Sequence, residues 1–392
     1  MVSTIAWLDA SREDQRRIRE VLNLFAQHES RDELGVGQVR DAFSDRLFPG
    51  TSTLHTRARY LLLIPWCYRA AAGRARTTQE LEAGAAKNER LLIVALNSAG
   101  ATQGLIGRIA LTKLKTLPSS LYWSALNQYG VLVGDVADEL ARRSWSAEAE
   151  ELVERKPRMW DVPPLPEGFP ELEARLDLST DEAAWVKERL LHGSRGSLLE
   201  VLLKEADPAL LQLDYAWQVP TQDDDLTAIR EHARLFSLVV QGAALTYNRA
   251  LAQRYEHKGY DAVENPTEVY DERLREWIAE AAPDARAVAA WDLPDLWARV
   301  REQNPNLSWT TRRFVEDWVD LLRAGVSPDR PEAAALVTAR ERAVKRKQSR
   351  LDNEKLLRSW SGASGTGRLT YRWSNVQRLV GDVLEGQHHA GS

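Results

Sequence analysis

Apolar residues recur with helical spacing along almost the whole chain of 392 residues, and this pattern limits the fold more than any other feature. One such stripe consists of Phe314, Val315, Trp318, Val319 and Leu322. Its members repeat every three to four residues, which places them on one face of a helix. Runs that alternate polar and apolar side chains, as half-buried strands do, are almost absent. The sequence therefore predicts an all-α, multi-helix fold.

Local signals add detail to this prediction. Residues 231–255 are apolar on more than one face, which predicts a central buried helix, and Gly242 would let a neighbouring helix approach it closely. Ser179 and Glu182 have the spacing of a capping box, and Ser11 predicts the start of another helix. The 14 tryptophans are expected mainly to fill the core, with each indole N–H near a carbonyl.

The segment RKPRMWDVPPLPEGFPE, residues 155–171, interrupts the helical pattern. Its five prolines cannot lie inside a continuing helix and favour an extended, semi-rigid connector. We therefore expect two domains: a basic helical domain over residues 1–156, a Pro-rich linker over 157–170, and a helical domain over 171–392.

The net charge of −5 hides a strong partition along the chain. Residues 46–134 hold eleven basic and three acidic side chains, and residues 337–392 hold eleven basic and five acidic ones. The stretch 135–336 is strongly acidic. Such segregation indicates a basic surface for an anionic partner, or acidic and basic parts that meet each other. A mosaic surface whose charges interleave in space is the alternative.

Residues 48–69, FPGTSTLHTRARYLLLIPWCYR, combine a turn, three capping hydroxyls and a helix that opens with Arg57 and Arg59 before it becomes apolar. Together with the preceding helical stripe, this resembles the layout of a helix–turn–helix, in which the first residues of the second helix meet DNA. The alternative is a buried helix whose arginines pair with acids elsewhere in the chain.

Residues 104–131 predict a second pair of helices. Arg108 and Lys113 would lie on the first helix, and Asn127 and Gln128 on the second, which starts after Pro118. No acid occurs between residues 89 and 135. Amide side chains suit base edges and phosphates, so we expect these four residues to contact nucleic acid.

A third basic segment predicts a helix over residues 338–358. It carries Lys345, Arg346 and Lys347, which could follow a phosphate backbone as a secondary patch. The same helix could instead dock on the acidic middle of the chain.

Catalytic signatures are absent from the sequence: no HExxH, paired CxxC, P-loop or GxSxG pattern is present. We therefore expect no catalytic residue, no metal and no cofactor. An enzyme whose carboxylates converge only in the fold remains an alternative, and it predicts a pocket where several acids crowd with raised pKa values.

The single cysteine, Cys67, fits a reducing compartment, and the N-terminal residues show no secretory signal. The longest apolar run, residues 60–68, is too short to span a membrane. We expect a soluble cytoplasmic protein with no membrane partner.

Three stretches carry a resemblance to a known family: RDELGVGQVRDAFSDRLFPGTSTLHTRARYLLLIPWCYR, LIGRIALTKLKTLPSSLYWSALNQYGV and GRLTYRW. In them the chain resembles an uncharacterised bacterial family that carries a domain-of-unknown-function label. The resemblance runs nearly end to end and transfers no catalytic residue. It implies genes located near helicase and phospholipase D-like nuclease genes, in antiphage defence islands that resemble the DISARM class.

These observations lead to one hypothesis and a second of another class. The first is a noncatalytic, all-helical accessory subunit of a bacterial defence system, which binds DNA or a helicase or nuclease partner. The second is a pure protein–protein scaffold, in which the acidic middle takes a basic partner.

Overall fold

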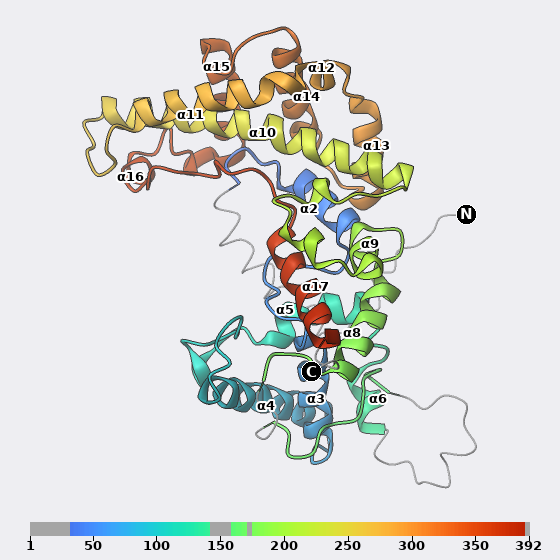
Figure 1. Cartoon of the computed structure of the whole chain (residues 1–392). Helices are drawn as coiled ribbons and strands as arrows, with labels where there is room; N and C mark the ends of the chain where they lie inside the picture. Colours follow the sequence, from blue (N-terminus) through green and yellow to red (C-terminus); the bar gives the residue numbers. More distant parts are fainter. Residues whose placement is uncertain (1–31, 142–157, 171–174, 389–392) are drawn as a thin grey trace, which may run out of the picture. The chain divides into compact units, whose positions relative to one another are not determined.

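The computed structural model describes residues 32–141, 158–170 and 175–388, and every regular element in these ranges is a helix (Figure 1). One isolated antiparallel bridge joins Leu132 to Trp160. The all-α prediction is therefore confirmed. The helix expected after Ser11 lies outside the described residues. The chain forms two compact units: within the described ranges, unit 1 comprises residues 48–213 and 372–388, and unit 2 comprises residues 32–47 and 214–371.

Unit 1 is built from two parts of the chain, one before and one after residues 214–371 of unit 2. Its elements are α3 (Tyr60–Ala72), α4 (Thr78–Ser98), η1 (Leu111–Lys113), α5 (Pro118–Gln128), α6 (Val136–Ala141), α8 (Thr180–Gly193), α9 (Leu198–Glu205), η3 (Pro208–Gln212) and α17 (Trp373–His388). Helix α3 packs against α4 and α5, while α8 packs against α17 and α9.

Helix α3 is the centre of one half of unit 1, and all of its residues except Arg69 and Ala70 are buried. The indole of Trp66 donates to the carbonyl of Pro163 at 3.1 Å. The guanidinium of Arg69 donates to the carbonyls of Trp160, Val162 and Pro163. An extended Pro-rich segment keeps its carbonyls free to accept such bonds, because it forms no helix of its own.

The Pro-rich segment is therefore an integral part of unit 1, and the two units do not divide where we expected a linker. Met159 and Trp160 are almost fully buried, and the backbone N–H groups of Val133 and Asp161 complete a short pairing between residues 131–134 and 159–161. Prolines exclude a helix, but they do not exclude packing into a core. This is why the predicted boundary over 157–170 differs from the observed one.

Helix α8 begins as the sequence predicts. Ser179 and Glu182 form a reciprocal capping box, in which the Ser179 hydroxyl accepts from the Glu182 N–H and the Glu182 carboxylate accepts from the Ser179 N–H. Two otherwise unpaired donors at the helix start are satisfied in this way.

Unit 2 is arranged around one long helix. Its elements are α2 (Gly37–Leu47), η4 (Ala216–Gln218), α10 (Asp224–His257), α11 (Pro266–Ala281), η5 (Ala282–Asp284), α12 (Ala285–Ala290), α13 (Leu293–Gln303), α14 (Trp309–Arg323), α15 (Pro331–Lys345), η6 (Arg346–Gln348) and α16 (Glu354–Arg358). Helix α10 packs against α11, α15, α2, α13 and α14, among others.

The buried centre of α10 confirms the prediction for residues 231–255. A Cβ atom at Gly242 would lie 2.6 Å from the ring of Trp277 on α11, so a glycine is needed for the two helices to approach this closely. The indoles of Trp277 and Trp318 donate to the carbonyls of Leu238 and Val239 at 3.1 and 2.8 Å. These two tryptophans fill the core and pair their N–H groups with nearby carbonyls, as expected. The buried indole N–H groups of Trp160, Trp297 and Trp360 have no such partner among the described residues.

Candidate nucleic-acid interface

The stretch before α3, which includes Arg57 and Arg59, lies in the interior of unit 1. The side chain of Arg57 donates from Nε to both carboxylate oxygens of Asp382 on α17, at 2.9 and 3.0 Å. Its Nη2 donates to Asp177 at 2.6 Å. Burial opposes the charged guanidinium, but the hydrogen bonds and charges of Asp382 and Asp177 outweigh it and raise the pKa of Arg57.

Arg59 is fully enclosed, with no solvent-exposed side-chain surface. It forms a bidentate pair with Glu182, from Nε at 3.1 Å and from Nη2 at 2.7 Å, and its Nη1 donates to the carbonyl of Arg175 at 2.7 Å. The carboxylate that caps α8 thus also holds the buried guanidinium. In such a bidentate pair the planar guanidinium and the carboxylate form two parallel hydrogen bonds between opposite charges, which makes the pair suited to a buried position.

Both arginines therefore follow the alternative stated above, in which they pair with acids elsewhere in the chain. A phosphate could reach Arg57 or Arg59 only after a buried ion pair had broken. The helix–turn–helix hypothesis for this segment also loses its geometric basis, because α2 belongs to unit 2 and α3 to unit 1. A helix–turn–helix needs both helices in one packed unit.

His55 and Tyr122 complete the interior around Arg57. Their rings stack with centroids 4.2 Å apart, and Nε2 of His55 lies 3.1 Å from the carbonyl oxygen of Leu121. Burial lowers the pKa of His55 to about 4, so the imidazole is neutral at pH 7. The Tyr122 hydroxyl accepts from the N–H groups of Thr56 and Arg57 and donates to the Arg57 carbonyl.

Sequence reasoning missed Asp382 as the partner of Arg57. It lies beside Val383 in the apolar stripe of α17, and its side chain is 5% exposed. A carboxylate within a buried stripe is rarely left without a partner, and this was the available signal.

The first helix predicted for residues 104–131 is not formed. Residues 104–117 make a loop, which we call the 104–117 loop, with one short turn at η1. Positive φ angles at Gly104, Gly107 and Leu111 exclude a continuous helix. The second helix is confirmed as α5, which begins at Pro118 itself, where we expected it to start just after that proline.

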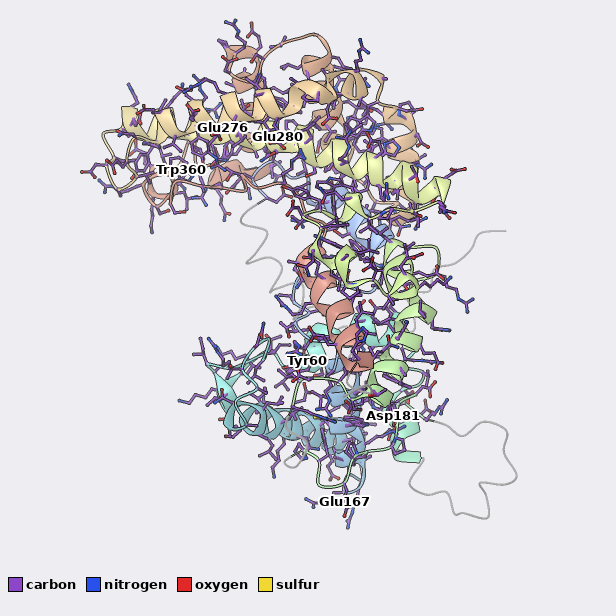
Figure 2. All side chains as sticks on the ribbon, viewed as in Figure 1. Tyr60, Glu167, Asp181, Glu276, Glu280 and Trp360 are labelled. Carbon is purple, nitrogen blue, oxygen red and sulfur yellow. The ribbon has the colours of Figure 1, made fainter. Side chains whose placement is uncertain are left out.

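The 104–117 loop is anchored to the helices beneath it. The N–H of Ile106 donates at 3.0 Å to the hydroxyl of Tyr60, the first residue of α3 (labelled in Figure 2). A Cβ atom at Gly107 would lie 2.7 Å from Leu114 and 3.4 Å from Ile93 of α4, so the loop closes tightly on itself and on that helix.

Cations on this loop and on α4 face solvent. Arg108, Lys113 and Lys115 on the loop and Lys87 on α4 are exposed. Within the described ranges, none of these four side chains has a hydrogen-bond or ion-pair partner. We call this group the basic surface. The one carboxyl among residues 83–134, Glu89, is buried and accepts the N–H of Ser119 at 2.8 Å.

The amide residues predicted on α5 lie at its C-terminal end, and both are exposed. Gln128 donates to the carbonyl of Gly193 at 2.7 Å, which occupies part of its side chain. Asn127 has no side-chain hydrogen bond to the rest of the described chain. It therefore remains a candidate for contact with a ligand.

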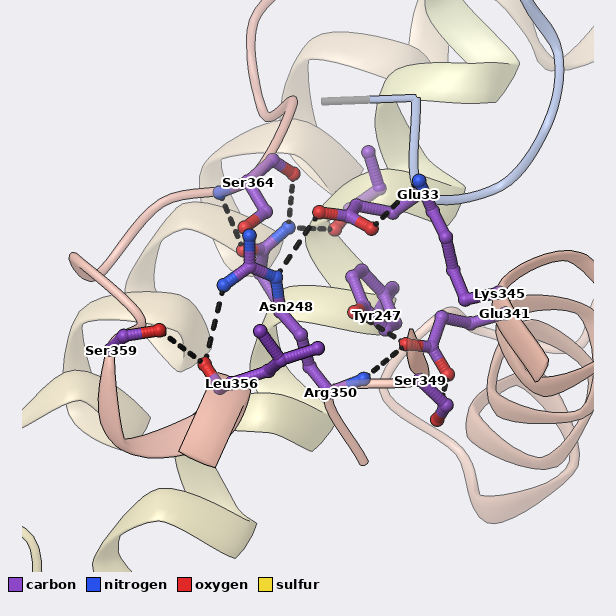
Figure 3. A network of polar contacts seen from close by, with 11 residues as sticks. Glu33, Tyr247, Asn248, Glu341, Lys345, Ser349, Arg350, Leu356, Ser359 and Ser364 are labelled. Carbon is purple, nitrogen blue, oxygen red and sulfur yellow. Dashed lines mark hydrogen bonds and ion pairs between the residues drawn. The ribbon is translucent and has the colours of Figure 1, made fainter. Parts of the chain in front are cut away.

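The third basic segment is not one helix over residues 338–358. Helix α15 ends at Lys345, Arg346 adopts a φ of +50°, and a separate short helix, α16, follows. The buried carboxylate of Glu341 explains the break, because it accepts from the Ser349 hydroxyl at 2.5 Å and from the Arg350 N–H at 2.7 Å (Figure 3). These bonds require the chain to fold back over α15.

The secondary patch is reduced by the same network. Lys345 pairs with Glu33 at 3.3 Å, and Arg350 pairs with the same carboxylate at 3.2 Å (Figure 3). Arg346 and Lys347 are exposed, and their side chains have no partner in the part of the chain that the structure describes. Two of the three predicted residues thus remain available at this surface.

The enzyme alternative predicts crowded acids with raised pKa values. Burial raises the pKa of Glu341, but its carboxylate is already held by Ser349, by the Arg350 N–H and by the Tyr247 hydroxyl at 3.3 Å. Among the described residues, no group of three or more His, Cys, Asp or Glu side chains is placed to hold a metal ion.

Comparison with known proteins gives one match, to a family model. No curated protein and no solved structure matches the chain. None of the helices in the described ranges combines the length and apolar character needed to cross a membrane. A family model described as a family of unknown function, DUF6361, matches residues 2–387. Because the match covers nearly the whole chain, the protein belongs to this family of unknown function.

Proposed function

We propose that the protein is a noncatalytic DNA-binding subunit that contacts the phosphate backbone through the basic surface of unit 1. The observation that carries this proposal is the group of four exposed cations, Lys87, Arg108, Lys113 and Lys115, without an exposed carboxylate among residues 83–134. Cations without internal partners raise the local concentration of a polyanion and release its counterions on contact.

The buried arginines have a different role in this proposal. A Cβ atom at Gly104 would lie 2.7 Å from Cγ of Arg57, so the start of the 104–117 loop rests on the side chain that Asp382 holds. Arg57 therefore packs against the start of the 104–117 loop and holds it in position. The cations of the loop make the contact with DNA.

Asn127 on α5 and the pair Arg346 and Lys347 in unit 2 extend the proposal. The exposed amide of Asn127 can donate to a phosphate and accept from a base. Arg346 and Lys347 supply a second, smaller basic patch. Each additional phosphate that they neutralise would steepen the dependence of binding on salt.

The proposed biological role is that of an accessory subunit in a bacterial antiphage defence system, in the cytoplasm, alongside a helicase or phospholipase D-like nuclease. The support for this role is the genomic neighbourhood implied by the family resemblance. A protein–protein scaffold is the alternative, and its support is the acidic stretch over residues 135–336, which could take a basic partner.

The test is fluorescence anisotropy with short duplex and single-stranded DNA across a salt series. If four phosphates are neutralised on duplex DNA, the logarithm of the binding constant should fall with the logarithm of salt with a slope of about −3.6. Reversal of Arg108 and Lys113 to Glu should weaken binding and flatten the slope. Arg195→Glu, a charge reversal at an exposed arginine on the α8–α9 turn, is the matched control for each single reversal, Arg108→Glu or Lys113→Glu. No binding at low salt would overturn the proposal.

A further inference from the structure

Ile109 is the most exposed of the large hydrophobic residues in the described ranges, with 91% of its surface accessible. Single exposed apolar residues are common on protein surfaces and need no explanation by themselves. The position of Ile109 is less common, because it directly follows Arg108 and lies within the 104–117 loop between cations of the basic surface.

The backbone that carries Ile109 is closed by hydrogen bonds. The N–H of Leu111 donates to the carbonyl of Gly107 at 2.7 Å, and the N–H of Lys113 donates to the carbonyl of Ala110 at 2.9 Å. Leu111 adopts a φ of +47°, a conformation that is costly for a residue with a side chain. The chain therefore holds a tight turn in which the isoleucine is turned toward solvent.

We propose that Ile109 is a wedge that enters between adjacent base pairs of the DNA held by the basic surface. This inference rests on the proposed function. Proteins that bend DNA insert a single apolar side chain, often Leu, Ile, Phe or Met, at a base step while neighbouring Arg and Lys residues hold the phosphates. The loop offers both components, with Arg108 next to the wedge and Lys113 and Lys115 beyond it.

Duplex DNA is favoured over other partners by the chemistry around Ile109. A protein partner usually buries a continuous apolar core in the interface, whereas here the isoleucine lies among cations. The loop is not helical, so it cannot enter a major groove as a recognition helix does. A short turn with one apolar tip instead fits the minor-groove side of a kinked base step.

The experiment measures binding and bending together on one duplex of about 25 base pairs, labelled at both ends for energy transfer and carrying 2-aminopurine at internal steps. The wild-type protein should bring the ends closer and raise 2-aminopurine fluorescence, because unstacking removes quenching by neighbouring bases. Ile109→Ala should lose both signals and keep its affinity within about tenfold, since phosphate contacts supply most of non-specific binding. Val133→Ala, at another exposed apolar residue of unit 1, is the matched control and should bend DNA as the wild type does.

The outcomes separate the two proposals. Wild-type protein that binds DNA without any change in end-to-end distance or 2-aminopurine fluorescence would overturn the wedge and leave the DNA-binding proposal standing. Ile109→Ala protein that bends DNA like the wild type would overturn it too. Binding of Ile109-containing protein to anionic phospholipid vesicles, lost in Ile109→Ala while DNA bending is unchanged, would assign the residue to a lipid surface and overturn the wedge. Absence of DNA binding would overturn both proposals.

Discussion

Two basic stretches of unit 1 look alike in the sequence and have opposite positions in the fold. Residues 55–59 and the 104–117 loop each combine arginine or lysine with turn residues ahead of a helix. In the first, Arg57 and Arg59 are enclosed and bonded to carboxylates from α8, α17 and the segment before α8. In the second, Arg108 and Lys113 face solvent. The comparison teaches that basic residues near a helix start identify a surface only where no carboxylate is within reach.

The largest expected effect comes from breaking the buried pair. Arg59→Ala should lower the free energy of unfolding of unit 1 by about 3–5 kcal/mol, because Glu182 would be left as a nearly buried charge with only the more distant Arg175, at 3.9 Å, as a counterion. Urea unfolding followed by tryptophan fluorescence measures this loss. The double variant Arg59→Met with Glu182→Gln should recover part of it. A loss below about 1 kcal/mol for Arg59→Ala would contradict the structural role of the pair.

Acid should destabilise the same region through His55. Because burial lowers its pKa to about 4, the unfolded chain binds a proton at pH values where the folded chain does not. Stability from this residue is therefore complete above pH 6.5 and declines as pH falls toward 4, by about 3 kcal/mol in total.

Unfolding curves at several pH values check the contribution of His55. In His55→Gln the part of the pH dependence between 6.5 and 4 should disappear, since glutamine does not titrate and can still donate to the Leu121 carbonyl. An unchanged slope of stability against pH in this variant would assign the acid sensitivity to other groups.

Charge reversal in the 104–117 loop should weaken DNA binding and leave the stability of the fold almost unchanged. Arg108→Glu with Lys113→Glu should change the free energy of unfolding by no more than about 0.5 kcal/mol, as is usual for surface substitutions. The same variant should lower the affinity for duplex DNA by about tenfold or more at low salt and reduce the salt slope by about two. A large loss of stability with unchanged DNA affinity would reverse the assignment of the two stretches.

The smallest effect is expected at the patch in unit 2. Arg346→Glu with Lys347→Glu should reduce the salt slope by less than two, because these two cations are fewer than the four of the basic surface. The control is Arg275→Glu, at an exposed arginine on α11 that pairs with Glu272. If the Arg346 and Lys347 variant abolishes binding while the reversal at Arg108 and Lys113 does not, the primary interface lies in unit 2.

The sequence predicted correctly those features of the fold that depend on interactions between residues close together in the chain or on one face of a helix. The capping box at Ser179, the start of α5 near Pro118 and the close approach at Gly242 each depend on residues a few positions apart or on one face of a helix, and all are observed. The helix expected over 338–358 failed because Glu341 needs donors from residues 349 and 350, which a straight helix cannot bring to it.

The candidate site could be predicted only in part, because exposure depends on distant residues. Arg57 is separated from Asp382 by 325 positions, and no local pattern links them. Arg108 and Lys113 are exposed, but the absence of acids between residues 89 and 135 does not predict this by itself, because Arg57 and Arg59 also lie in a stretch without acids, residues 46–79, and are buried. The Pro-rich segment illustrates the same limit: its prolines exclude a helix, but the carbonyls that hold Trp66 and Arg69 have no signature in the sequence.

The pairing of Arg57 with Asp382 also has a consequence for biosynthesis. Residues 214–371 of unit 2 lie in the chain between the two parts of unit 1, so a ribosome makes the whole of unit 2 before it makes α17. Until α17 emerges, the nascent chain holds an interior arginine without its main counterion. Products of translation interrupted within α17 would therefore carry a finished unit 2 attached to an incomplete unit 1, and proteases could distinguish them from the full-length protein by that unfinished core.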